Sequence, residues 1–266
     1  MSAREAIVAI VRPPTEALAR CALTHIARRP IDVARARAQH AAYVATLARL
    51  GAEVIALAPE PELPDAVFVE DIAVVLDELA VVTIPGADSR RPEIESVAAA
   101  LEAFRTVQRM RPPGTLDGGD VIVLDRTLLV GESTRTNGAG IAQLADAVRP
   151  FGYHVRGVPV GGVLHLKSAA TYLGRGTVLV NPEWVDPARL GARQVIEVDP
   201  AEPHAANTFQ VGDALVMAGG FPHTMARLAL RGFAPLTVDL SELQKAEAAG
   251  SCMSLIFRRR PGEGLA

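Results

Sequence analysis

Cysteine is scarce in this sequence, with two residues in 266. Two cysteines cannot form the disulfide framework of a small secreted domain, so we expect a reducing, cytoplasmic setting and a free thiol at Cys252. A long hydrophobic run is also missing near the N-terminus. The six-residue apolar run at 6–11 is too short for a signal-peptide core or a membrane span, and we expect a buried strand there. We therefore expect no membrane role.

The sequence also has no basic stripe and no low-complexity linker. Its formal net charge of −3 argues against nucleic acid as a partner. Hydrophobic residues make up 49% and charged residues 21%, a composition that supports a substantial core. The length would fit one large domain or two small ones. Because no linker divides the chain, we expect a single catalytic domain over residues 1–266.

A pair of short apolar runs joined by a polar turn recurs along the chain. The pairs lie at 68–86, 118–133, 166–183 and 205–220, with Asp-Glu, Asp-Arg, Gly-Arg-Gly and Gly-Asp at their turns. Each pair is typical of a β-hairpin. The recurrence predicts a fold assembled from copies of one supersecondary unit.

Helical patterns lie between the hairpins, at 33–51, 92–104, 137–152 and 222–233. A fifth unit is split between the two ends of the chain, because 251–260 would pair with 6–14. Five units predict an α/β fold closed into a ring, with hairpins inside and helices outside. Ring closure removes the exposed edges that open sheets present.

A closed ring brings residues that are far apart in sequence to one central axis. Five segments directly precede the inner strands and should converge: 68–71, 117–120, 165–168, 205–207 and 250–252. Three of them contain Cys252, His165 and Asp117. A thiol, an imidazole and a carboxylate can act as nucleophile, proton shuttle and orienting group. A lone cysteine is more often a small buried hydrophobe, but this position in the repeat favours catalysis.

The same region holds charges for a ligand with two charged ends. Glu70 and Asp71 lie inside an apolar run, where burying two acids is costly unless they bind a partner. A guanidinium matches carboxylates in paired geometry. Arg90 and Arg135 follow the first two hairpins and could hold a carboxylate, and Asp65 could hold an ammonium group. These residues predict a free amino acid with a guanidinium tail as the ligand.

Eight stretches of the chain resemble one family, the dimethylarginine dimethylaminohydrolases of the guanidino-group-modifying superfamily. In order they are "IDVARARAQHAAYV", "LPDAVFVEDIAVV", "PGADSRRPE", "TLDGGDVI", "VGESTRTN", "LHLKSA", "AAN" and "SELQKAE…CMSL". They cover nearly the whole chain in the family's order. The resemblance implies a five-bladed, pseudo-symmetric α/β propeller of ββαβ-type units around a central active site. It also implies hydrolysis of asymmetric dimethylarginine or monomethylarginine to citrulline and an alkylamine, without a cofactor or metal.

The resemblance also implies a role for each matching residue. Cys252 would be the nucleophile, His165 the general acid and base, and Asp117 the supporting carboxylate. The other assignments concern substrate binding: Glu70 and Asp71 for the guanidinium, Arg90 and Arg135 for the α-carboxylate, Asp65 and the Leu23 carbonyl for the α-amino group, and Glu247 for the ureido end. Leu23 lies in residues 20–30, which would form a mobile lid and are called the lid segment below. Phe68 is our candidate for an apolar wall beside the guanidinium.

Two positions depart from the family pattern. Ala249-Gly250-Ser251 precedes the cysteine where the family usually has Gly-Leu-Thr, which bears on the shape of the leaving-group pocket. Glu132 replaces an apolar residue after Gly131. Two other functions compete with a dimethylargininase: an arginine deiminase, whose typical chains carry an extra helical insert, and a catalytically silent arginine-binding protein. The sequence is compatible with a homodimer, and it does not encode a preference among methylated arginines.

Overall fold

The computed structural model describes residues 6–260, and its strands form five three-stranded sheets. Every sheet has the same plan, in which an inner strand pairs antiparallel with a middle strand and an outer strand pairs parallel with that middle strand. In inner, middle, outer order the sheets are β15 (Ser254–Arg258), β1 (Ile7–Val11), β2 (Ala52–Ala56); β3 (Ala73–Val75), β4 (Ala80–Val82), β5 (Val107–Arg109); β6 (Val121–Leu124), β7 (Thr127–Glu132), β8 (His154–Pro159); β9 (Ala170–Gly174), β10 (Thr177–Val180), β11 (Gln194–Glu197); and β12 (Thr208–Val211), β13 (Ala214–Ala218), β14 (Leu236–Val238). The five expected units are therefore confirmed.

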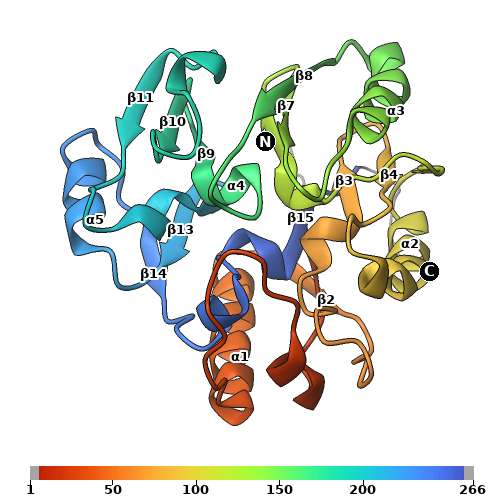
Figure 1. Ribbon diagram of the computed structural model, residues 1–266, viewed down its shortest axis with the longest axis horizontal. Helices are drawn as coiled ribbons and strands as arrows, with labels where there is room; N and C mark the ends of the chain where they lie inside the picture. Colours follow the sequence, from red (N-terminus) through yellow and green to blue (C-terminus); the bar gives the residue numbers. More distant parts are fainter. Residues whose placement is uncertain (1–5, 261–266) are drawn as a thin grey trace.

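Four helices connect a middle strand to the outer strand of its own sheet and lie at the periphery of the molecule (Figure 1). They are α1 (Val33–Arg49), α2 (Ile94–Glu102), α3 (Gly138–Val148) and α5 (Pro222–Ala229). The fourth unit, between β10 and β11, has only a short turn at 187–189, which agrees with the lack of a helical pattern there. Among residues 6–260, no helix has the length and hydrophobicity to cross a bilayer.

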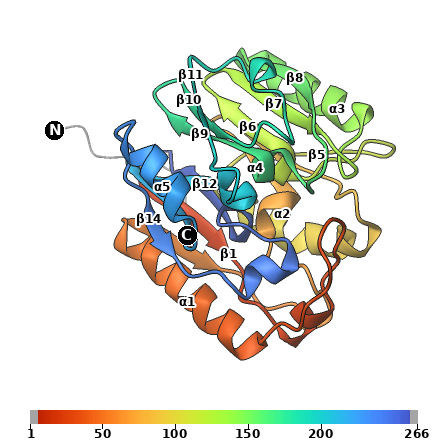
Figure 2. The ribbon, with the colours of Figure 1, turned by 60° about the vertical axis from the view of Figure 1, so that its left-hand side comes forward.

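The chain ends meet in one sheet and close the ring. β15 runs antiparallel to β1, with Ile7 opposite Arg258 and Val11 opposite Ser254. The split fifth unit is thus confirmed, and Figure 2 shows α1 lying along the outside of this sheet. The expected single domain of 1–266 stays a prediction, and its residues 1–5 and 261–266 lie outside the described part.

Each sheet, together with the segment that connects its middle and outer strands, forms one blade of the ring, and apolar packing joins each blade to the next. The buried side chains form five clusters, and each cluster is shared by two adjacent blades. In β7, Leu128 and Val130 face one cluster while Leu129 faces the next, and all three are fully buried. Since successive side chains of a strand point to opposite faces, a strand between two clusters must be apolar at every position. This explains why the middle strands read as mostly apolar runs.

A short helical turn precedes every inner strand, and the five turns gather at the centre of the ring. They are residues 69–72, 118–120, 203–206 and 251–253, together with α4 (Leu166–Ala169). The turn at 69–72 contacts those at 118–120 and 251–253, and α4 contacts those at 118–120 and 203–206. The predicted convergence of these segments therefore exists, and each segment folds as a short helical turn before its strand.

Candidate active site

His165 and Asp117 each stand immediately before one of the central turns. His165 Nε2 lies 3.0 Å from Asp117 Oδ2, and both side chains are buried. The other oxygen of Asp117 accepts the Gly86 N–H at 2.8 Å. On its second side the imidazole faces Asp71, with Nδ1 3.9 Å from Oδ1. The ring is therefore held between two carboxylates, and Nε2 is committed to Asp117.

The carboxylates around His165 favour its protonated form. Burial alone would lower the pKa of His165, but Asp71, Asp117 and Asp120 outweigh burial and raise the pKa to about 9. Burial would likewise raise the pKa of Asp71, yet His165 and Arg90 lower it below its usual range. At neutral pH the site thus holds an imidazolium beside ionised Asp71. Such an imidazolium is a ready proton donor.

Gly119 lets the backbone approach the imidazole closely. A Cβ at this position would lie 2.6 Å from His165 Nδ1 and 2.7 Å from Asp71 Oδ1, closer than real Cβ contacts. The Gly119 N–H donates to the same Asp71 oxygen at 3.0 Å. A glycine is therefore needed at position 119, because it allows a backbone N–H to reach Asp71 beside the imidazole ring.

Cys252 lies in the turn before β15, and its side chain is half-buried. Its Sγ accepts the Ala249 N–H at 3.4 Å. Burial raises the pKa of the Cys252 thiol to about 12, and the negative charges of Glu70 and Asp71 add to the rise. The free protein therefore holds a protonated thiol. A cation bound beside Sγ would offset the carboxylates and lower the pKa, so a cationic ligand would itself promote formation of the nucleophile.

Asn207 ties the Cys252 turn to α4. Its Oδ1 accepts the Ser251 N–H at 3.1 Å, and its Nδ2 donates to Ser251 Oγ and to the Lys167 carbonyl, each at 3.0 Å. Neither Asn207 nor Ser251 was among the predicted site residues. The segment 205–207 was expected at the centre, but the short stretch "AAN" does not reveal that its asparagine joins two neighbouring turns.

Glu70 and Asp71 are adjacent in sequence but line different cavities. Glu70 accepts from Lys167 Nζ at 2.6 Å and from Ser251 Oγ at 2.8 Å. Glu70 and Lys167 line a cavity of about 150 Å³ together with Gly118 and residues of β3, β6 and β15. Asp71 lines a second cavity with Cys252. The structure thus pairs Glu70 with Lys167 and Ser251, whereas the sequence placed it beside Asp71 on the guanidinium.

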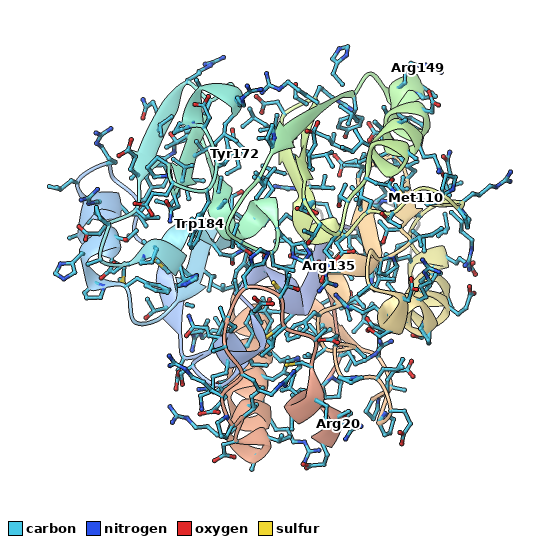
Figure 3. The ribbon with its side chains drawn as sticks, in the orientation of Figure 1. Arg20, Met110, Arg135, Arg149, Tyr172 and Trp184 are labelled. Carbon is cyan, nitrogen blue, oxygen red and sulfur yellow. The ribbon has the colours of Figure 1, made fainter. Side chains whose placement is uncertain are left out.

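The cavity of Cys252 collects most of the predicted site residues. Arg135, which lies near the centre of the ring in Figure 3, is one of them. The predicted residues that line this cavity are Asp65, Phe68, Asp71, Arg90, Arg135, His165, Glu247 and Cys252. Its volume is about 20 Å³, room for roughly one water molecule. Asp117 does not line this cavity, and it contacts His165 as described above.

Arg90 and Arg135 have different surroundings. Arg90 is buried, and all three of its guanidinium nitrogens have protein partners, among them both oxygens of Glu93 and one of Asp71. Burial would lower the pKa of Arg90, but Glu93 and Asp71 raise it well above its usual range. Arg135 is half-buried and donates to Thr24 Oγ1 at 3.2 Å. Arg135 is therefore the more accessible of the two cations.

The lid segment is held by two carboxylates of the same cavity. The Ala22 N–H lies 3.2 Å from both oxygens of Asp65. Glu247 accepts from the backbone N–H groups of residues 24–26. The half-buried Leu23 lies between these anchors. Glu247 was predicted to touch the ureido end of the ligand, and in this structure its oxygens face the lid segment.

Three side chains have the geometry of a cation site. Asp71, Asp117 and His165 each bring a ligand atom within 4.8 Å of the others. Metal binding would have to displace the proton that the raised pKa of His165 favours at neutral pH. The expectation of a metal-free site stays a prediction.

Comparison with known proteins points to one family. The family model described as N,N dimethylarginine dimethylhydrolase, eukaryotic, matches residues 25–198. The N(G),N(G)-dimethylarginine dimethylaminohydrolase of Streptomyces coelicolor is 41% identical over 251 residues, which cover 94% of this chain and 96% of that protein. The similarity thus spans nearly the full length of both.

Solved structures share the fold of this chain. A cysteine-to-serine variant of the dimethylarginine dimethylaminohydrolase from Pseudomonas aeruginosa, complexed with citrulline, matches with a TM-score of 0.89 at 34% identity. A histidine-to-glycine variant of a dimethylarginine dimethylaminohydrolase, an adduct with S-methyl-L-thiocitrulline, matches with a TM-score of 0.88 at 34% identity. Each comparison covers 94% of this chain and 98% of the other, so the fold agrees over nearly the whole chain.

Proposed function

The chain belongs to the dimethylarginine dimethylaminohydrolase family, and we propose that it hydrolyses N-omega-methylated L-arginines to L-citrulline and dimethylamine or methylamine. One observation carries the proposal: Cys252, His165 and Asp71 line the same cavity as Asp65 and Arg135. A nucleophile, a proton donor and charges that match both ends of an amino acid therefore act in one place.

Recognition divides between the two ends of the substrate. Asp71, which stays ionised, accepts hydrogen bonds from the unmethylated side of the guanidinium. Arg135, which no carboxylate pairs within the described residues, binds the α-carboxylate. Asp65 and the Leu23 carbonyl bind the α-amino group. Arg90 supports the site by fixing Asp71, and it contributes to carboxylate binding only through an exchange of its present partners.

The chemical step begins with the Cys252 thiol. The positive guanidinium lowers the thiol pKa, and the thiol proton leaves to solvent. The thiolate attacks the guanidinium carbon and forms a carbon–sulfur bond. The protonated His165 then donates its proton to the methylated nitrogen, so that the carbon–nitrogen bond breaks and dimethylamine or methylamine leaves with the bonding electron pair. Asp117 holds Nε2 of His165, which leaves Nδ1 as the nitrogen that delivers the proton.

Water completes the reaction. The now neutral His165 takes a proton from a water molecule, whose oxygen attacks the carbon of the covalent intermediate. The carbon–sulfur bond breaks, the hydroxyl proton passes to the departing sulfur, and citrulline is released. Cys252 is again a thiol and His165 again an imidazolium. Apart from the attacking water and the solvent that takes the thiol proton, the groups in these steps belong to residues of the chain.

Preference for a methylated guanidinium follows from the apolar side of the cavity. Phe68 lines it, and two methyl groups on one nitrogen would face this wall rather than a carboxylate. An unmethylated arginine would place N–H groups there without partners, which costs about 1–3 kcal/mol. Arginine should therefore be processed roughly 5- to 150-fold less efficiently than asymmetric dimethylarginine.

One assay tests the proposed function. The protein is incubated with asymmetric dimethylarginine, monomethylarginine and arginine, and both citrulline and the released amine are measured. We expect asymmetric dimethylarginine to react most efficiently and release dimethylamine. Monomethylarginine should follow and release methylamine, and arginine should release little ammonia. An arginine kcat/KM equal to that of dimethylarginine would make the protein a deiminase, and binding of all three without citrulline would make it a silent binding protein.

Location and assembly are separate proposals. The two cysteines, Cys21 and Cys252, are free, which supports a reducing compartment, and we assign the protein to the cytoplasm. A homodimer is also proposed. Sedimentation equilibrium should then give twice the 28.1 kDa of the chain, and a mass equal to one chain would reject the dimer.

A further inference from the structure

Glu247 binds three consecutive backbone N–H groups of the lid segment. Its Oε2 accepts from Thr24 at 2.7 Å, and its Oε1 accepts from His25 and Ile26 at 2.5 and 3.0 Å. We propose that Glu247 is a positioning residue that latches the lid segment over the cavity of Cys252 and must release it before substrate can enter or product can leave.

The size of the closed cavity requires such a release. Its volume of about 20 Å³ is far smaller than an amino acid with a guanidinium tail. The latch itself lies at the solvent edge, since Thr24 and His25 are exposed. Water can therefore replace the carboxylate on these N–H groups when the segment lifts, and no buried donor is left unpaired. Three hydrogen bonds hold the segment, and their place at the solvent edge allows them to open.

The backbone of Glu247 indicates that its side chain is the reason for its presence. Its φ is +57°, in the left-handed region, where glycine and asparagine are favoured over a glutamate. It follows the short helical turn Leu243–Ala246, a position that glycine commonly fills. A glutamate is therefore a less favourable choice for this backbone, and the three contacts with the lid segment offset that cost.

The latch also sets the direction of the Leu23 carbonyl. The Leu23 C=O and the Thr24 N–H belong to one peptide group, which is trans, so they point in opposite directions. When Glu247 holds the Thr24 N–H, the Leu23 oxygen must point away from Glu247. Asp65 fixes the other side of Leu23 through the Ala22 N–H. The closed latch thereby orients the carbonyl to which the proposed function assigns the α-amino group.

Closure of the lid is linked to the nucleophile through the chain. Glu247 lies five positions before Cys252, and the Ala249 N–H between them donates to the Cys252 sulfur. A shift of Glu247 toward or away from the lid therefore acts on the segment that places the thiol. This part of the inference rests on the proposed function, whereas the latch itself does not.

Hydrogen–deuterium exchange without substrate tests the latch directly. The amides of residues 24–26 should exchange about tenfold faster in E247Q than in wild type, because the amide side chain is uncharged and can accept with one atom only. The Gly119 amide, bonded to Asp71, should be unchanged. Equal exchange of 24–26 in both proteins overturns the proposal.

Two further variants separate the latch from general loosening. E202Q is the matched control, because Glu202 also accepts two successive N–H groups, those of His223 and Thr224, but in another blade. It should leave the exchange of 24–26 as in wild type. E247G removes the carboxylate and suits the positive φ, so it should fold at least as stably as wild type and still show fast exchange. A stable E247G with slow exchange of 24–26 overturns the proposal.

Kinetics distinguish a positioning role from a chemical one. With asymmetric dimethylarginine, E247Q should raise KM about tenfold and leave kcat unchanged or higher, while E202Q matches wild type. A kcat about 100-fold lower at unchanged KM would place Glu247 in the chemical step and overturn the positioning role. If wild type itself releases no citrulline, the proposed function fails, and the exchange experiment still decides the latch.

Discussion

His165 Nε2 lies 3.0 Å from Asp117 Oδ2, and this contact fixes which nitrogen of the imidazole faces the substrate. Asp117 also helps raise the pKa of His165 to about 9. We predict that D117N lowers kcat by about 10²- to 10⁴-fold, the usual contribution of a positioned acid–base group. The loss of the charge should also lower the His165 pKa, so activity should fall at a lower alkaline pH than in wild type.

The measurement is kcat across pH 6 to 10 for both proteins, with the melting temperature as a check on folding. A D117N profile that superimposes on that of wild type would show that Asp117 does not act through His165.

The Cys252 thiol of the free protein should react slowly with alkylating reagents. Its pKa of about 12 keeps it protonated. Below that pH, the thiolate fraction increases tenfold for each unit by which the pH is raised. We predict that the rate of iodoacetamide alkylation rises without a plateau from pH 7 to pH 10. Cys21 is fully buried and serves as an internal control in the mass spectrum.

Glu70 provides a check on the cause of this slow reaction. Its charge contributes to the raised thiol pKa, so E70Q should alkylate faster than wild type at every pH below the plateau. A wild-type plateau near pH 8 to 9, as for an ordinary thiol, would contradict the environment described for Cys252.

Arg135 should matter only for substrates that have an α-carboxylate. A charge-assisted hydrogen bond is worth about 1.5–3 kcal/mol, so R135Q should lower kcat/KM for asymmetric dimethylarginine by roughly one to two orders of magnitude. For an agmatine-type analogue, which lacks the carboxylate, R135Q should leave kcat/KM unchanged. Equal losses for both substrates would make Arg135 structural.

R90Q should behave differently from R135Q. Removing Arg90 leaves the buried carboxylates of Asp71 and Glu93 without their cation, so we expect a lower melting temperature and lower activity with both substrates. The comparison of the two variants separates carboxylate binding from support of the site.

Asn207 should position the nucleophile. N207A removes the hydrogen bonds to Ser251 and to the Lys167 carbonyl, and we predict a 10- to 100-fold lower kcat, equivalent to about 1.4–2.8 kcal/mol. Asn181 is the matched control, because it donates to the Pro203 carbonyl and accepts the Glu183 N–H in a similar way. N181A should lower the melting temperature without changing kcat. Equal kcat losses in both variants would refute a specific role for Asn207.

The ring could be predicted from the sequence because its physical requirements recur in every unit. Each middle strand is buried between two clusters, so its side chains are mostly apolar on both faces, as Leu128, Leu129 and Val130 show. The polar turns between paired runs then mark the hairpins. The split unit followed from the need to pair the two terminal runs, and the pairing of Ile7 with Arg258 agrees.

The directions of individual side chains could not be predicted in the same way. Glu70 and Asp71 lie in one helical turn, where successive side chains diverge by about 100–120°, so neighbours in sequence line different cavities. The lid contacts of Glu247 depend on a left-handed backbone that no periodicity encodes. Asn207 joins turns that are distant in the chain, which only the closed ring brings together. These positions are set by tertiary packing rather than by local pattern.

Mass spectrometry of the enzyme quenched with acid during turnover of asymmetric dimethylarginine tests the central claim most directly. The account predicts a covalent adduct on the peptide that contains Cys252, with an added mass equal to the substrate minus dimethylamine, and no adduct in C252S. Release of citrulline without any adduct on Cys252, or turnover by C252S near the wild-type rate, would contradict covalent catalysis by this residue.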